Sequence, residues 1–213
     1  MNSFSSSTIC RRRAICSLLY LFLFAGFCQG QDEARTESTA AEKNSAIATA
    51  ARGQIGVTIR YVPDYVSMEY PNGDVPKETG VCTDVVIRAL RKTGQDLQKL
   101  VHEDMRANFS HYPKNWGLSR TDRNIDHRRV PNLKTFFKRK GMSLPVTQKA
   151  GDYKPGDLVT CSVAGKLPHI MVVSDKKSRS GVPLVIHNIG SGTREEDRLF
   201  DFPITGHYRF YRD

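Results

Sequence analysis

The stretch GVCTDVVIRALRKTG (residues 80–94) decides how this chain folds. Its apolar residues recur at the spacing of one helix face: Val85, Val86, Ala89 and Leu90. Asp84 lies at the start of the predicted helix and basic residues lie at its end, which favours the helix dipole, and Gly94 is a stop signal. We therefore predict an amphipathic helix with Cys82 in its first turn.

The segments on either side of this helix predict an α+β domain. Helix formers fill residues 40–52, 96–112 and 133–141. The last third holds short β-rich runs separated by turn signals: DLVTCSV, HIMVVSD, PLVIHNIG and HYRFYRD. Helices followed by closely spaced strands predict an antiparallel sheet, and we expect the helix that begins at Cys82 to pack on it. Residues 56–68 are expected to be a strand or an extended loop, followed by an irregular loop.

The first residues are predicted to be a targeting signal rather than part of the folded domain. Residues 11–13 (RRR) precede an apolar run, residues 14–27, which is shorter than the about 20 residues of a membrane span. A basic flank and a short apolar centre are typical of a secretory signal peptide, here residues 1–30, although an uncleaved anchor is the alternative. We expect residues 31–42 to be a flexible leader and residues 43–213 a single domain. This organisation predicts a periplasmic or secreted protein without a stable membrane span.

Composition narrows the class of protein further. The chain has 213 residues, 39% hydrophobic and 25% charged, which excludes collagen-like, low-complexity and disulfide-dense proteins. The net charge of +10 favours anionic partners such as nucleic acid, cell-wall teichoate or phospholipid, and charge alone does not choose among them. Because the predicted signal peptide argues for export, we expect no nucleic-acid partner.

Two cysteines remain after the predicted signal peptide, Cys82 and Cys161. In an oxidising compartment they can form a disulfide. The alternative is that Cys82 is a working thiol and Cys161 a core residue of a strand. A helix N-terminus lowers the pKa of a thiol, so the position of Cys82 favours a nucleophile, while a small buried residue is the plainer interpretation.

Two histidines are placed to complete such a site. His169 begins one apolar run and His187 ends the next, and Gly181 suggests a hairpin turn between them. The two imidazoles are then expected to be neighbours. A thiol, a base and a group that orients the base form an activated nucleophile.

Other signals are weaker. The run Asp126-His127-Arg128-Arg129 is either a rim that grips a substrate carboxylate or a salt-bridged loop that packs under the sheet. No HExxH or CxxC spacing predicts a metal, and we expect no cofactor, although Cys82, His169 and His187 could instead bind zinc.

Several blocks of the sequence resemble a family of exported bacterial proteins that carry domain of unknown function 1287. These blocks are YP (70–71), GVCTDVV (80–86), NIDHRR (124–129), YKPGD (153–157) and PHI (168–170). That family in turn resembles NlpC-like cell-wall cysteine peptidases, which have a papain-like fold.

The resemblance implies a peptidoglycan stem-peptide amidase or endopeptidase. It implies Cys82 as the nucleophile, His169 as the base, His187 as its orienting group and Tyr70 as a helper at the oxyanion. Asp84 departs from the Asp-Cys-Ser-Gly pattern of those peptidases, and a carboxylate near Cys82 raises the pKa of its thiol. A non-catalytic module that binds the cell wall or a protein partner on the same scaffold is the alternative function.

Overall fold

The computed structural model describes residues 38–212 and has four α-helices in this part of the chain: α1 (Ala40–Arg52), α2 (Cys82–Lys92), α3 (Leu97–Ala107) and α4 (Val130–Arg139). The predicted signal peptide, residues 1–30, lies outside the described residues. The predicted leader, residues 31–42, extends three residues into α1, which begins at Ala40. A capping box causes this early start: Glu42 donates its N–H to the Thr39 hydroxyl and accepts from the Thr39 N–H.

A six-stranded antiparallel sheet forms the second layer. Its strands are β3 (Ser143–Leu144), β4 (Leu158–Val163), β5 (Leu167–Lys177), β6 (Pro183–Asn188), β7 (Thr193–Glu196) and β8 (Ile204–Tyr208), in the order β3-β8-β4-β5-β6-β7. The prediction of an antiparallel sheet in the last third is confirmed. The sequence analysis missed β3 and β7, and β8 ends at Tyr208 rather than continuing to the end of the chain.

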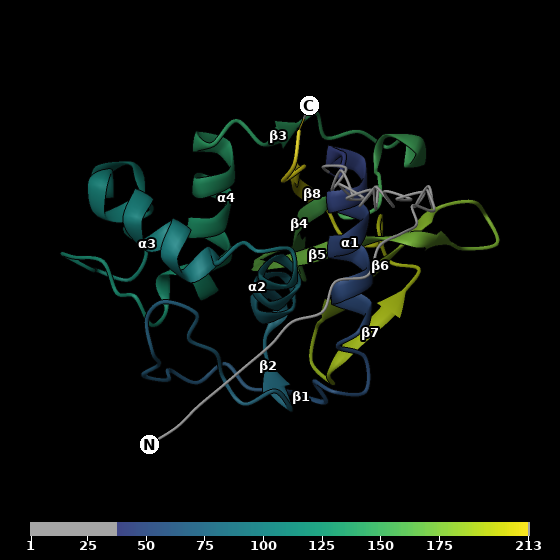
Figure 1. Cartoon of the computed structure of the whole chain (residues 1–213). Coiled ribbons are helices and arrows are strands. Elements are labelled where there is room, and N and C mark those ends of the chain that lie inside the picture. The colour runs from purple at the N-terminus through teal and green to yellow at the C-terminus, as the bar shows by residue number, and fades with distance from the viewer. Residues whose placement is uncertain (1–37, 213) are drawn as a thin grey trace, which may run out of the picture. The chain divides into compact units, whose positions relative to one another are not determined.

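The two faces of the sheet bury different clusters. Figure 1 shows α1 and α2 side by side, and both pack against β5 and β6, where Ile170, Val172 and Ile186 belong to the same buried cluster as α2. The opposite face holds Met171 and Val173 of β5 together with Cys161, Val185 and Leu199. Burying each large aliphatic side chain stabilises the fold by about 1.5–3 kcal/mol, so both faces hold the sheet in place.

The β5–β6 hairpin is closed by a turn at one end, and its backbone ladder stops short of the other end. Gly181, with φ of 83°, supplies the left-handed conformation that the turn requires. The ladder pairs Val172 with Ile186 but does not continue toward His169 and Asn188. The backbone ladder therefore stops before the end of the hairpin that carries the predicted histidines.

The segment before α2 is mostly irregular. Within residues 56–68, only Arg60–Tyr61 forms a strand, β1, which pairs in parallel with β2 (Thr79–Gly80). The side chain of Asn188 at the end of β6 donates to the Gly80 carbonyl at 3.1 Å. These contacts place the start of α2 next to that end of the hairpin.

Candidate active site

Cys82 is the first residue of α2, with Val81 as its N-cap. Cys82 is only 5% exposed, and its sulfur accepts a hydrogen bond from the backbone N–H of Ile170 in β5. Cys82 and Cys161 are both free, so the alternative of a disulfide between them is wrong. Cys161 is a core residue of β4, in agreement with the other interpretation.

Burial controls the reactivity of this thiol. Burial, with a smaller contribution from the neighbouring Asp84 carboxylate, raises the pKa of Cys82 to about 11. The backbone N–H groups of Ile170, Thr83 and Cys82 itself act in the opposite direction. The expectation that the helix start would lower this pKa is therefore wrong, because desolvation outweighs the N-terminal N–H groups.

His169 and His187 meet, as their spacing predicts. The two rings approach at 2.8 Å between Nε2 of His169 and Nδ1 of His187. On the other side of its ring, His187 Nε2 lies 3.0 Å from Oε2 of Glu196 in β7. Sequence reasoning missed Glu196 because it did not recognise the short strand β7, although an acidic pair at positions 195–196 was a visible signal.

The hydrogen bonds assign the tautomers of this relay. A carboxylate oxygen accepts, so His187 donates its Nε2–H to Glu196 and its Nδ1 carries the lone pair. His169 therefore donates from Nε2, and its Nδ1 is left as the basic nitrogen. Burial and then the neighbouring His187 lower the pKa of His169 to about 3, and burial lowers that of His187 against the opposing effect of Glu196. Both rings are neutral near pH 7.

The contact between thiol and base is not formed. Residues alternate faces along a strand, and His169 stands opposite Cys161, so it shares the sheet face that looks away from α2. Cys82 lies with the cluster on the α2 face. Within the described chain, no hydrogen bond joins Cys82 to His169. The sulfur nevertheless lies at the backbone of Ile170, the residue that follows His169.

Asp84 and Arg128 form a buried ion pair beneath the start of α2. The Arg128 fork donates to both carboxylate oxygens at 2.9 and 3.0 Å, and the two side chains are 4% and 2% exposed. Asp84 also accepts from the Val81 N–H at 2.7 Å, and Thr83 donates to the Arg128 carbonyl. Both residues are predicted to lie on the oxyanion and substrate side of the site; their polar groups pair with each other and hold the helix start, and Arg128 also lines the groove at Cys82.

Asp126 and His127 are likewise interior residues rather than a rim. Asp126 accepts from the Asp122 N–H at 2.6 Å, and burial raises the pKa of its carboxyl. His127 is 2% exposed, and burial lowers its pKa to about 3. Of the two interpretations of the run 126–129, the salt-bridged loop agrees with the burial of its first three residues, but these form one short turn packed against α3 and α4 rather than under the sheet.

Tyr61, rather than Tyr70, is the tyrosine beside Cys82. The Tyr70 ring lies edge-on to His102 of α3, with the ring centroids 5.2 Å apart. Burial, followed by the neighbouring Cys82 and Asp84, raises the pKa of Tyr61 to about 12, so its hydroxyl stays protonated. The sequence could not distinguish the two tyrosines, because only the pairing of β1 with β2 brings Tyr61 to the start of α2.

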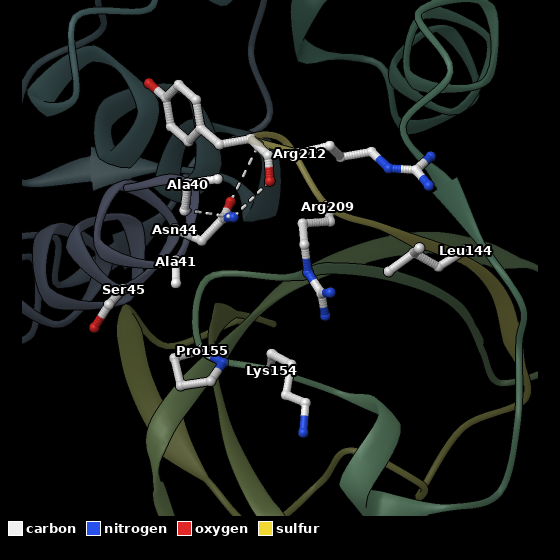
Figure 2. A pocket seen from close by; sticks show the side chains of 10 residues that line it. Ala40, Ala41, Asn44, Ser45, Leu144, Lys154, Pro155, Arg209 and Arg212 are labelled. Atoms are coloured by element: carbon white, nitrogen blue, oxygen red, sulfur yellow. Dashed lines mark hydrogen bonds between the residues drawn. The ribbon is translucent and has the colours of Figure 1, made fainter. Parts of the chain in front are cut away.

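A groove of about 760 Å³ opens at Cys82. Tyr61, Tyr65 and Trp116 are among its lining residues, and so is Pro168, which precedes His169 in β5. Figure 2 shows another cavity, of about 610 Å³, which contains Lys154 and Arg209 but none of the predicted site residues. The groove at Cys82 is thus the candidate active site.

Within residues 38–212, His, Cys, Asp and Glu side chains form no group of three or more that could hold a metal ion. The alternative of a zinc site at Cys82, His169 and His187 gains no support from this arrangement. None of the helices described is both long enough and apolar enough to cross a membrane.

The chain belongs to the family defined by the domain of unknown function DUF1287, whose family model matches residues 48–210. A relative in Escherichia coli (strain K12), the uncharacterized protein YijF, is 57% identical over 171 residues, covering 80% of this chain and 83% of that protein. Among solved structures, NlpC1 from Trichomonas vaginalis is similar over 83% of this chain, at 12% identity and a TM-score of 0.42. This chain spans about half of the NlpC1 chain (47%). At this TM-score the likeness carries no argument about activity.

Proposed function

We propose that this protein is an exported cysteine hydrolase with a papain-like fold that cleaves amide bonds of cell-wall peptides. The observation that carries the proposal is the hydrogen-bonded relay from Glu196 through His187 to His169. It ends one residue from Ile170, whose backbone contacts the Cys82 sulfur. A carboxylate that orients one histidine, which in turn orients a second histidine, is the arrangement of an oriented general base, and the Cys82 sulfur contacts the next residue of the same strand.

The proposed reaction begins from neutral groups. His169 Nδ1 takes the proton from the Cys82 thiol as the sulfur attacks the amide carbonyl carbon. The resulting oxyanion accepts hydrogen bonds from the Cys82 backbone N–H and from the Tyr61 hydroxyl, which takes the role first assigned to Tyr70. His169 then returns the proton to the leaving amine, and a water molecule, deprotonated by His169, hydrolyses the thioester.

Substrate binding must complete this site. Because the thiol is buried, has a raised pKa and does not contact His169, the free protein is in a resting state. We propose that a peptide in the groove moves the sulfur and the ring together, which is consistent with the loose catalytic contacts of many unliganded enzymes. The same observations favour the second candidate, a non-catalytic module that binds the cell wall or a partner in the same groove.

Digestion of purified sacculi distinguishes the two candidates. Wild-type protein is expected to release peptide fragments with new termini, detected by mass spectrometry, while Cys82→Ala and His169→Gln variants release none. Cys161→Ala, which removes the other thiol, is the matched control and is expected to cleave. Intact sacculi that bind and sediment wild-type protein without any fragment release would establish the binding module instead.

The proposed location rests on the sequence alone. Residues 1–30 are proposed to direct export and to be removed, which leaves a periplasmic or secreted protein that meets peptidoglycan. Cell fractionation with N-terminal sequencing of the mature protein tests this, and recovery of the protein in the cytosol with its first residues intact would contradict it.

A further inference from the structure

Exposed aromatic side chains gather at the groove of Cys82. Tyr61, Tyr65 and Trp116 are 38%, 58% and 41% exposed, and all three line its walls. Large apolar side chains that are exposed together are typical of a ligand-binding surface. The groove volume of about 760 Å³ lies within the range of about 300–1,000 Å³ seen for sites that enclose small ligands.

Two of these rings are held in place before any ligand binds. The Tyr65 hydroxyl donates to Asp122 at 3.1 Å and accepts from the Asn124 amide at 2.8 Å. Trp116 lies against the Arg129 guanidinium, 4.1 Å from the ring centroid. A fixed aromatic surface loses little side-chain entropy on binding, so these rings are suited to pack against a ligand.

The charged side chains among the described residues that line the groove are all basic. The lining includes Arg128, Arg129 and Lys166, and none of the described residues that line the groove is an aspartate or glutamate. Arg128 is neutralised by Asp84 at 2.9 Å, but Arg129 reaches its nearest carboxylate, Asp126, only at 3.4 Å. Lys166 is exposed and forms no ion pair with any residue between 38 and 212. Lys166 therefore offers an unpaired cation to a ligand, while Arg129 lines the groove but already pairs with Asp126, and its side chain is 16% exposed.

We propose that this groove binds short acidic peptides, with carboxylates paired to Arg129 and Lys166 and the peptide chain packed on Tyr61, Tyr65 and Trp116. The inference deepens the proposed function, because it names the charge that the substrate peptide must carry. Aromatic rings with basic neighbours also occur in single-strand nucleic-acid sites. A peptide fits better here because, outside the Asp84–Arg128 pair, Arg129 and Lys166 are the only cations among the described lining residues, whereas a nucleic-acid channel tracks successive phosphates.

Binding is measured on Cys82→Ala protein, so that cleavage cannot interfere. Trp116 is the only tryptophan of the chain, so its fluorescence reports occupancy of the groove directly. The probes are a blocked tetrapeptide with two glutamates, its two-glutamine analogue, and a single-stranded oligonucleotide. We expect the glutamate peptide to bind about tenfold more tightly than the glutamine peptide, and the difference to shrink at high salt.

Variants that remove single positive charges test which cations bind the carboxylates of the glutamate peptide. Lys166→Gln is expected to weaken binding of the glutamate peptide by about three- to fivefold and to leave the glutamine peptide unchanged. Arg129→Gln, which also removes the contact that holds Trp116, is expected to weaken binding of both peptides, and of the glutamate peptide more. Lys177→Gln, which removes an exposed cation from the far end of β5, is the matched control and should have no effect. Equal affinity for both peptides, tighter binding of the oligonucleotide, or no change in Trp116 fluorescence would each overturn the proposal. Acidic-peptide binding without any cleavage of sacculi would refute the hydrolase and leave this inference standing.

Discussion

Replacing Asp84 with asparagine tests how the start of α2 is held. The Asp84 carboxylate accepts from two nitrogens of Arg128 and from the Val81 N–H, at 2.9, 3.0 and 2.7 Å, and the side chains of the pair are 4% and 2% exposed. Asp84→Asn leaves the guanidinium charged, buried and without its counter-ion. Breaking one partner of such a pair costs about 3–5 kcal/mol, a large share of the about 5–15 kcal/mol that stabilises a domain.

Urea unfolding followed by circular dichroism measures this loss. The matched control is Asp201→Asn, which removes one partner of the exposed Arg198–Asp201 pair and should cost less than about 1 kcal/mol. If Asp84→Asn does not fold, the double variant Asp84→Leu/Arg128→Met removes both charges and is expected to be more stable than either single variant. A loss below about 1 kcal/mol for Asp84→Asn, or a double variant no better than the singles, would refute this account of the helix start.

Three further predictions concern the titrating groups. Because the pKa of Cys82 is about 11, its alkylation by iodoacetamide at pH 7.4 should be about a hundredfold slower than that of an ordinary thiol; labelling that saturates below pH 8.5 would contradict the burial argument. Glu196 raises the pKa of His187, so Glu196→Gln should lower it in an NMR titration and, on the proposed mechanism, reduce kcat/KM at least tenfold. The pKa of His169 is about 3 in the folded protein and about 6.5 in the unfolded chain, so protonation in acid favours unfolding. The contribution of His169 to the free energy of unfolding should therefore fall by about 3 kcal/mol between pH 7 and 4. His169→Gln should remove this part of the pH dependence.

The parts of the fold that follow from local pattern could be predicted from the sequence. The helix that begins at Cys82 shows its apolar face and charge order directly, and β4 to β6 show as apolar runs between turns. The meeting of His169 and His187 followed from one hairpin turn, because a hairpin fixes the separation of residues on its two strands. Short elements such as β7 lack such a pattern, and Glu196 was missed with it.

The features of the site that could not be predicted from the sequence depend on contacts between distant segments of the chain. The ion pair of Asp84 with Arg128 joins distant segments, so the sequence left Arg128 available to substrate when its fork is already taken. Burial is set by the whole fold, and for this reason the pKa of Cys82 moved upward although its place on a helix favours a downward shift. Tyr61 likewise reaches the site only through the pairing of β1 with β2.

The most direct test of the hydrolase is a search for its covalent intermediate. Wild-type protein is mixed with soluble peptides released from sacculi, quenched in acid within milliseconds to seconds, and mapped by mass spectrometry. The proposal predicts a transient acyl group on Cys82 that appears before the cleaved products and is absent from Cys161. Peptide cleavage by a protein whose Cys82 never carries an acyl group would contradict it, as would an unmodified Cys82 with uncleaved peptides.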